Sequence, residues 1–232
     1  MRDSDATMIR SLPLFHDMAD DSFEELVRGA YVQSFPPMVD LLIEGDSSDF
    51  LHIVIDGTVE LTAGWNEGET TMTVLREGAT FILAAVVRDA PNLMSARTLE
   101  KSKVIMLPAE DVRRVFEQDH AFARAVVREL AFCYRGVIKC VKGLKLRTSL
   151  ERLANYLLKW QKKLGGDACF TLPVEKRRLA SILGMTPENL SRAIKALRPY
   201  GVVVTGLNVE ITKPDDLKQL AKPTPLIDDT RS

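Results

Sequence analysis

The fold is decided by residues 174–200, VEKRRLASILGMTPENLSRAIKALRPY. Its first part predicts a short helix over residues 174–183, followed directly by Gly184, which can take a positive φ just past a helix C-terminus. Thr186 then stands where an N-cap belongs, with Pro187 at the first helical position, where its missing N–H costs nothing. The stretch therefore predicts two short helices joined by a tight turn.

The second predicted helix has two chemically different faces. Apolar side chains recur at helical spacing on one face: Leu190, Ala193, Ile194 and Leu197. Polar side chains take the opposite face: Glu188, Ser191, Arg192 and Lys195. A helix whose back rests on a core and whose exposed N-terminal turns carry Glu, Ser and Arg can lie in a DNA major groove. The same pattern also fits an ordinary helical hairpin with a solvated charged face, so the neighbouring residues must decide.

Short β-rich runs flank the two helices. Residues 202–205 and 209–212 are separated by Gly206-Leu207-Asn208, which predicts a hairpin, and residues 169–172 form another run just upstream. A strand, two helices joined by a turn, and a hairpin together indicate a winged helix-turn-helix. This context favours a DNA-binding domain over a plain helical hairpin.

The helix-turn-helix region resembles a known protein family. Residues 172–204, LPVEKRRLASILGMTPENLSRAIKALRPYGVVV, resemble the DNA-binding end of the CRP/FNR family of bacterial transcription regulators. Within them, LGMTPENLSRAIKALRPYGV is most similar to the DNR/NNR branch, which responds to nitric oxide. The family's base-reading pattern, Glu-x-x-Ser-Arg, falls on Glu188, Ser191 and Arg192, and the resemblance implies TTGA-type half-sites.

The chemistry of these side chains predicts their roles. Arg192 should donate to a guanine edge and Glu188 can accept from a cytosine amino group, while Ser191 is the more adaptable contact. Other residues are expected to contact phosphates or to support the helix, which sets register rather than sequence: Thr186, Lys176, Arg177, Asn189 and Lys195.

The composition is that of an ordinary soluble globular protein, with 232 residues, 46% hydrophobic and 27% charged, which is room for two modest domains. No run approaches a membrane span and residues 1–10 lack the apolar core of a signal peptide, so a cytoplasmic location without membrane contact is expected. The three cysteines, Cys133, Cys140 and Cys169, form no CxxC pair and suggest neither disulfides nor zinc. The iron–sulfur cluster of the FNR branch uses cysteines near the N-terminus, and this chain has none before Cys133, so that cluster is excluded.

Charge is divided unevenly along the chain. The net charge is −1, but residues 1–118 hold 10 Lys/Arg against 21 Asp/Glu, a net charge of −11, and residues 147–213 hold 12 against 5, a net charge of +7. An acidic front and a basic rear indicate that the rear meets a phosphate backbone.

The front of the chain has a different character. Residues 1–30 predict a helical lead-in, and LPLFHDMADDSFEELV (residues 12–27) resembles the family's usual opening. Short β-rich runs follow, broken by Gly-containing turns at residues 44–46, 56–57, 66–68 and 77–78: residues 41–43, 50–55, 58–62, 70–75, 80–83 and 103–107. Such runs predict a sandwich or barrel. They resemble the β-roll of cyclic-nucleotide-binding domains, so the predicted fold class is α+β.

The sequence argues against a cyclic nucleotide as ligand. A buried cyclic phosphate needs a cation beside it, and the family supplies an Arg directly before a Ser/Thr-Ala pair. Here Met94 precedes Ser95-Ala96, and no acidic residue that could hold the ribose lies between Gly78 and Arg88. Arg88 and Arg97 are out of pattern and are expected to be solvated surface arginines.

An apolar effector or a haem is the remaining candidate for this domain, and plain core is the default for its apolar residues. The possible axial ligands are His16, His52 and His120 with nearby methionines, and each histidine is more readily explained as structural. No CxxCH motif is present, and only the DNR/NNR resemblance suggests haem. The histidines are also scattered in sequence, with no catalytic Ser, Cys or Gly-rich phosphate motif, so no metal site and no enzyme is predicted.

A long helix is predicted from about residue 120. Apolar residues fall at alternating spacings of four and three, a heptad seam that predicts a parallel dimer helix: Ala123, Val127, Leu130, Tyr134, Val137, Val141 and Leu144. Residues off the seam are expected to pack on the chain's own barrel: Phe122, Val126, Phe132 and Ile138. Gly136 and Gly143 are expected to interrupt the helix, at about 1 kcal/mol each relative to Ala.

These observations predict four segments. Residues 1–118 form a sensor or effector domain, residues 119–146 a dimerisation helix, residues 147–222 a winged helix-turn-helix with helices over 148–163 and 214–221, and residues 223–232 a loose tail. The predicted function is a homodimeric regulator of transcription, with double-stranded DNA, a second copy and RNA polymerase as partners. The alternatives are the same regulator class with another effector or none, and a binding or adaptor module of the cyclic-nucleotide class.

Overall fold

The computed structural model describes residues 3–66 and 68–229, and the chain forms two compact units, Met1–Cys133 and Tyr134–Ser232. Glu67, in the turn predicted at residues 66–68, lies outside the described residues. Residues 230–232 of the predicted tail also lie outside them. In the described residues, no helix is long and apolar enough to cross a membrane.

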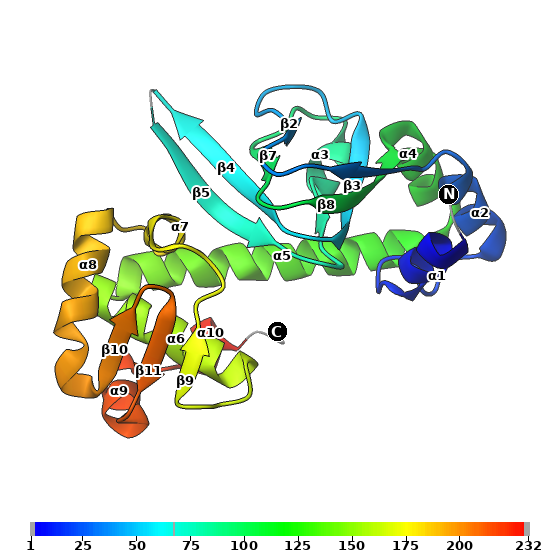
Figure 1. The fold of residues 1–232 in the computed structure, drawn as a ribbon. Coiled ribbons are helices and arrows are strands. Elements are labelled where there is room, and N and C mark those ends of the chain that lie inside the picture. The colour runs from blue at the N-terminus through cyan, green and yellow to red at the C-terminus, as the bar shows by residue number, and fades with distance from the viewer. Residues whose placement is uncertain (1–2, 67, 230–232) are drawn as a thin grey trace. The chain divides into compact units, whose positions relative to one another are not determined.

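The first unit is built on two four-stranded antiparallel sheets (Figure 1). One has the order β1 (Tyr31–Phe35), β8 (Ser102–Pro108), β3 (Phe50–Asp56) and β6 (Thr80–Phe81). The other has the order β2 (Asp40–Leu42), β7 (Ser95–Thr98), β4 (Val59–Trp65) and β5 (Gly68–Leu75). The predicted β-roll and the α+β class are confirmed, although the sequence did not single out β1 and β7 as strands.

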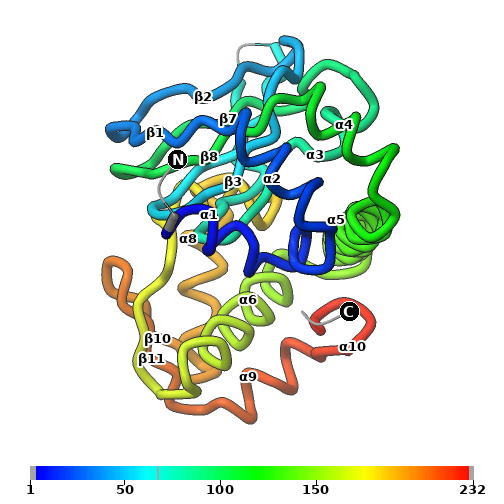
Figure 2. The backbone as a smooth tube through the Cα atoms, turned by 90° about the vertical axis from the view of Figure 1, so that its right-hand side faces the viewer, coloured from blue at the N-terminus to red at the C-terminus, as the bar shows by residue number. Residues whose placement is uncertain are grey.

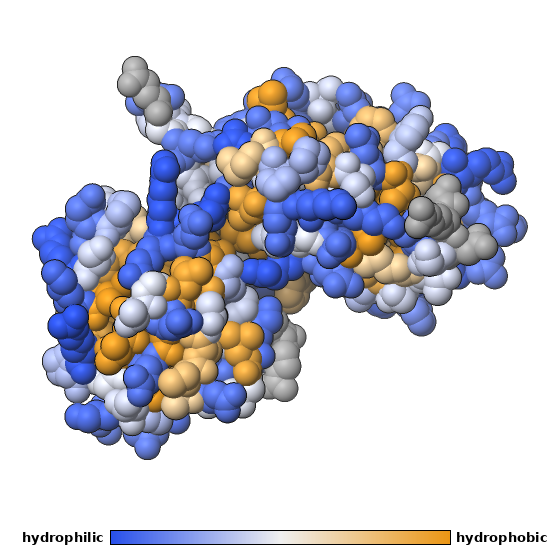
Figure 3. Space-filling model, in the orientation of Figure 1, coloured by the Kyte–Doolittle hydropathy of each residue, from blue (hydrophilic) through white to orange (hydrophobic). Residues whose placement is uncertain are grey.

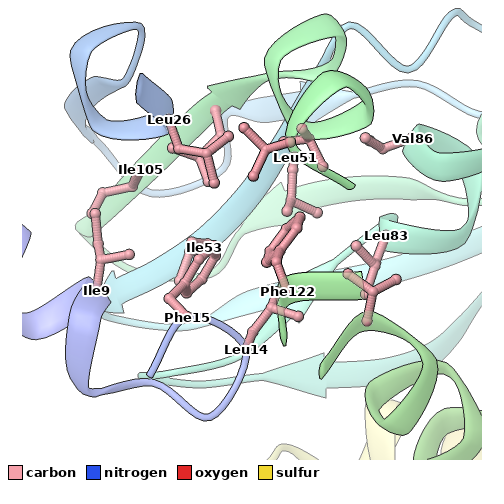
Figure 4. Packing of buried hydrophobic residues seen from close by; sticks show 14 of the residues in the cluster. Ile9, Leu14, Phe15, Leu26, Leu51, Ile53, Leu83, Val86, Ile105 and Phe122 are labelled. Atoms are coloured by element: carbon pink, nitrogen blue, oxygen red, sulfur yellow. The ribbon is translucent and has the colours of Figure 1, made fainter. Parts of the chain in front are cut away.

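The core of this unit lies between the first sheet and the helices that cover it. These are α1 (Asp3–Ser11), α2 (Asp20–Arg28), α4 (Ala109–Gln118) and the start of α5 (His120–Leu146). Leu51 and Ile53 of β3 are fully buried, and Phe15 stacks on Phe122 with 5.9 Å between ring centroids (Figure 4). Each such side chain contributes about 1.5–3 kcal/mol on burial. The other face of β3 presents Val54 to a smaller cluster inside the roll.

The predicted strand over residues 80–83 is wrong in its second half. After Phe81 the backbone turns at Ile82, which has a left-handed conformation (φ 59°), and helix α3 (Leu83–Arg88) begins. A β-branched residue at positive φ is strained, and Ile82 is held there by half-burial between the two apolar clusters. The side chains of Leu83 and Val86 on this helix point into the core (Figure 4).

Helix α5 is continuous over 27 residues, so the prediction that Gly136 and Gly143 interrupt it is wrong. Phe122 and Val126 are buried in the first unit as predicted. Phe132 and Ile138, which were expected to pack on the barrel, are instead 55% and 41% exposed. The apolar core of the first unit contacts the first turns of this helix through Phe122, Ala125 and Val126.

The second unit contains a three-stranded sheet, β10 (Val202–Thr205), β11 (Asn208–Ile211) and β9 (Cys169–Thr171) in that order, with helices packed against it (Figure 1). The helices are α6 (Ser149–Lys163), α7 (Lys176–Ile182), α8 (Pro187–Ala196), the short 3-10 helix η1 (Arg198–Tyr200), α9 (Pro214–Ala221) and α10 (Pro225–Asp228). Helix α6 starts at a capping box between Thr148 and Glu151. The predicted winged helix-turn-helix is confirmed, and α9 matches its predicted bounds.

The predicted loose tail is wrong for the residues that the structure describes. Residues 225–228 form the short helix α10, and Asp228 accepts two hydrogen bonds from Arg147, at 2.7 and 2.6 Å. Pro223 and Pro225 suggested a loose tail, whereas the ion pair of Asp228 with Arg147, which is distant in the sequence, holds the segment in place.

Candidate nucleic-acid interface

Local chemistry sets the geometry of the helix-turn-helix. Helix α7 ends at Ile182, and Gly184 follows with φ +60°. This left-handed backbone conformation favours glycine, and the glycine lies beside the Leu144 side chain of α5. The Thr186 hydroxyl oxygen then caps α8 by accepting from the Asn189 N–H at 3.2 Å. Leu190 and Leu197 are buried, which fixes α8 on the domain core.

The opposite face of α8 is open to solvent. Glu188, Ser191 and Arg192 are all exposed, and Figure 3 shows a band of hydrophilic residues over α8 at the left edge of the molecule. Arg192 Nη2 donates to Asn189 Oδ1 at 2.5 Å, and Ser191 Oγ donates to the Pro187 carbonyl at 2.9 Å. The three predicted base-reading residues thus share one accessible helix face.

Glu188 is suited to accept hydrogen bonds. Its own backbone N–H and the Thr186 hydroxyl donate to its carboxylate, and with the nearby Arg192 they lower the pKa of Glu188 below the usual value. The carboxylate is therefore ionised at neutral pH and presents acceptors only. This is the chemistry that a cytosine amino group requires.

The predicted supporting residues surround this face. Arg177 and Lys195 are exposed, and Lys176 is half-buried at the start of α7. Asn189 supports Arg192, as described above, and Thr186 acts as the cap of α8. Their positions fit the predicted contacts with phosphates, which stay a prediction.

One structural residue of the interface was not singled out from the sequence. Arg152 of α6 donates from Nε to the Leu183 carbonyl at 2.8 Å and from Nη2 to the Gly184 carbonyl at 3.3 Å. It thereby satisfies carbonyls that the end of α7 leaves open. In the sequence Arg152 is one polar residue of an amphipathic helix, and nothing local marks its partners.

Thr186→Ala should lower the free energy of unfolding by about 1 kcal/mol, because the Asn189 N–H loses its cap. Thr186→Ser keeps the capping oxygen and should retain most of that stability. Urea unfolding followed by circular dichroism measures both variants. If Thr186→Ala unfolds at the same urea concentration as the parent while DNA binding weakens, the residue acts through phosphate contact and not as a cap.

The effector domain has an apolar residue where a cyclic phosphate would need a cation. Met94 is half-buried and packs against the cluster of Val54, Val59, Leu61, Phe81 and Ala96 inside the roll. Leu83 is buried in the other cluster. Arg88 is exposed as expected, but the expectation of a solvated Arg97 is wrong, because Arg97 Nε donates to Asp40 Oδ1 at 2.6 Å and Nη1 lies 3.9 Å from Glu69 Oε2.

The three histidines differ in their environments. His16 is exposed and lies 2.8 Å from Asp17, and His120 is exposed at the first position of α5. His52 is buried and stacks on Phe81 with 5.0 Å between ring centroids. Its Nδ1 has no hydrogen-bond partner among the residues that the structure describes. Among the described residues, no group of three or more His, Cys, Asp or Glu side chains is placed to hold a metal ion.

The burial of His52 makes the first unit sensitive to acid. Burial lowers the pKa of His52 from its usual 6.5 to about 4. The unfolded chain therefore takes up the proton first, and stability that is complete above pH 6.5 is lost as the pH falls from 6.5 towards 4. Between pH 7.5 and pH 5 this group should remove about 2 kcal/mol from the free energy of unfolding.

Urea titrations at pH 7.5 and pH 5 test this expectation. His52→Leu removes the titrating group while keeping an apolar side chain, so its free energy of unfolding should change about 2 kcal/mol less between the two pH values than that of the parent. An equal pH dependence in both chains would contradict the assignment.

The predicted seam of α5 is largely open to solvent. Exposed fractions are 60% for Val127, 66% for Tyr134, 59% for Val137, 39% for Val141 and 42% for Leu144. Ala123 and Leu130 are half-buried. Helical geometry puts these residues on one side of α5, because they recur every three or four positions. Most of this apolar stripe is therefore open to solvent in the single chain, although Leu130 packs against the core of the first unit and Leu144 lies beside Gly184.

Comparisons with known proteins match both parts of the chain. The model for Crp-like helix-turn-helix domains matches residues 151–220, and the model for cyclic nucleotide-binding domains matches residues 32–119. The cyclic AMP receptor protein of Thermus thermophilus is 25% identical over 219 residues, which cover 92% of this chain and 98% of that protein.

Two further similarities concern only one part of a longer relative or only the fold. The potassium channel KAT1 of rice (Oryza sativa subsp. japonica) is 24% identical over 143 residues, which are 62% of this chain but only 18% of the channel. The crystal structure of DNR from Pseudomonas aeruginosa has a TM-score of 0.52 at 21% identity, covering 95% of this chain and 99% of that one, and so shows the fold alone.

One protein class accounts for three observations: the matched helix-turn-helix, the matched cyclic nucleotide-binding domain and the exposed polar face of α8. The chain is a DNA-binding transcription regulator of the CRP/FNR type, with an effector domain.

Proposed function

We propose that the chain acts as a homodimer on two-fold symmetric DNA sites with TTGA-type half-sites. The observation that carries this proposal is the shared exposure of Glu188, Ser191 and Arg192 on a helix whose other face is buried. Arg can donate two hydrogen bonds to guanine, and an ionised Glu can accept one from cytosine. The net charge of +7 over residues 147–213 favours approach to the phosphate backbone.

The exposed stripe of α5 supports the dimer. Seven apolar or aromatic side chains at heptad spacing are what a parallel two-stranded coiled coil buries. A two-fold axis along such a helix pair relates two copies of α8, and palindromic DNA has the same symmetry. Each half-site is then read by one chain.

We propose that the effector of the first unit is not a cyclic nucleotide. Met94 stands at the position of the expected cation and packs against the apolar cluster inside the roll, so the residue at this position cannot balance a cyclic phosphate. A small apolar effector, or regulation without an effector, fits these residues better. RNA polymerase is the expected protein partner of a regulator in this family, and the cytoplasm its expected location.

Nitric oxide sensing through haem is not part of the proposed mechanism, because the surroundings of His16 and His52 do not favour a haem at either residue. His16 is paired with Asp17 at the surface, and His52 is packed against Phe50 and Phe81. A haemin titration followed by absorption spectroscopy tests this point. A saturable Soret band at one haem per chain would restore the DNR/NNR interpretation.

Fluorescence anisotropy with labelled duplexes tests DNA binding. We expect tight binding to a palindrome with two TTGA-type half-sites, weaker binding to one half-site, and the weakest binding to a scrambled duplex of the same length. The salt concentration must be equal in all titrations, because phosphate contacts make affinity strongly salt-dependent. Equal affinity for the palindrome and the scrambled duplex would remove the proposed half-site, and no binding at all would remove the DNA-binding proposal.

A further inference from the structure

The C-terminal residues 222–229 lie beside α6 and the last turns of α5, all within the second unit (Figure 2). Helix α5 ends at Leu146 and α6 begins at Ser149, so only Arg147 and Thr148 connect the two helices. The direction in which the DNA-binding domain leaves α5 depends on this short junction. We refer to residues 222–229 as the brace segment.

The strongest contact of the brace segment is made with the junction itself. Arg147 Nη1 and Nη2 donate to the two carboxylate oxygens of Asp228 at 2.7 and 2.6 Å, a bidentate pair. The Arg147 side chain is only 10% exposed and that of Asp228 25%. Burial alone would raise the pKa of Asp228, but Arg147 and the Thr224 N–H outweigh it, so the pKa lies below its usual value and the pair is ionised at neutral pH.

Further contacts hold the two ends of the segment. Lys139 Nζ of α5 donates to the Asp229 carbonyl at 2.7 Å. Asn155 Nδ2 of α6, buried itself, donates at 2.6 Å to the carbonyl of Ala221, which directly precedes the segment. Lys222 Nζ lies 3.6 Å from Glu151 Oε1. One segment is thereby joined to the last turns of α5, to the junction and to the first half of α6.

The brace segment leaves the apolar stripe of α5 free. Lys139 is two residues from Val137 and two residues from Val141, and two residues correspond to about 200° around a helix. Its side chain therefore starts from the side of α5 opposite the stripe. Dimer formation and the brace use different faces of the same helix.

We propose that the brace segment fixes the angle between α5 and α6, and that it thereby sets the separation of the two recognition helices in the dimer. The expected effect on DNA binding rests on the proposed function. The contacts of the brace segment do not depend on the proposed function. A chain without these contacts keeps the helix-turn-helix, because α7, α8 and their cap are formed by other residues. In such a chain, α5 and the domain remain connected by Arg147 and Thr148 and by the neighbouring positions of Leu144 and Gly184.

Hydrogen exchange of the full-length chain tests the brace directly. Asp228→Asn keeps the size of the side chain but leaves the largely buried Arg147 side chain without its charged partner. Amide exchange over residues 143–152 should become at least about tenfold faster, because local opening at the junction then costs less free energy. Asp215→Asn is the matched control, since it removes an exposed ion pair with Lys218 (3.2 Å) from the neighbouring helix α9. It should leave exchange at the junction unchanged.

DNA binding supplies a second readout. The parent chain should discriminate sharply against palindromes lengthened by one or two base pairs between half-sites. Asp228→Asn should bind the best palindrome several-fold more weakly and should lose most of that discrimination, which a general loss of stability would not produce. If the parent binds no palindrome, the proposed function fails, yet exchange still tests the brace. Exchange at parent rates in Asp228→Asn, with circular dichroism showing an intact fold, would overturn the inference.

Discussion

Arg192→Ala should weaken binding to the cognate palindrome by about 1–3 kcal/mol for each half-site, while binding to scrambled DNA hardly changes. Arg192 is exposed on α8, and its guanidinium is oriented by Asn189. Removal of the side chain deletes donors to a base edge without disturbing the buried face of the helix. Anisotropy titrations on both duplexes at one salt concentration measure the difference.

Lys195→Ala is the matched control for Arg192→Ala. Lys195 lies on the same exposed side of α8, and its predicted contact is with a phosphate. Its loss should weaken binding to specific and scrambled DNA by similar factors and reduce the salt dependence. If Arg192→Ala behaves in the same way, with equal losses on both duplexes, Arg192 is not a base-reading residue.

Val137→Glu should convert the dimer into monomers. Val137 lies in the middle of the apolar stripe and is 59% exposed in the single chain, so the substitution should not disturb the fold of one chain. In the dimer it would bury two like charges in place of two apolar side chains. We expect dimer affinity to fall by at least about 3 kcal/mol, roughly a hundredfold, with a similar or larger loss of binding to the palindrome. Light scattering and sedimentation measure the change of mass.

Phe132→Glu is the matched control for Val137→Glu. Phe132 is 55% exposed on the same helix but is two residues from Leu130 and from Tyr134, and so lies on the side away from the stripe. The chain should remain a dimer. If Phe132→Glu dissociates and Val137→Glu does not, the dimer interface lies on the other face of α5.

The helix-turn-helix could be predicted from the sequence because its determinants are local. Gly184 ends one helix, and Thr186 and Pro187 start the next. The structure places α7 within two residues of its predicted bounds, and α8 begins at Pro187 as predicted. The α5 stripe is equally local, since periodicity alone defines it. The exposure of Glu188, Ser191 and Arg192 follows from the same periodicity. The base that each contacts depends on the DNA as well.

What the sequence did not reveal depends on partners that are distant in the chain. Strand β7 is short and contains Ser95 and Arg97, and it is a strand because β2 and β4 pair with it on both sides. Arg97 was expected in solvent, but Asp40 meets it across the sheet. Ile82 lies in an apolar run whose periodicity fits a strand and a helix equally well. Packing of Ile82 between two apolar clusters determines that the strand ends there and a helix follows. Asp228 pairs with Arg147, and the two residues are 81 positions apart in the sequence.

The proposed pairing of two α5 helices would make the cellular concentration of the protein a factor in regulation. If only the dimer reads a palindrome, then at concentrations well below the dimer dissociation constant the amount of dimer rises with the square of the total chain. A twofold change in synthesis would then change operator occupancy about fourfold at low occupancy. Any effector that strengthens the α5 pairing would shift the concentration at which this steep response begins, even if it left the contacts of α8 with DNA untouched.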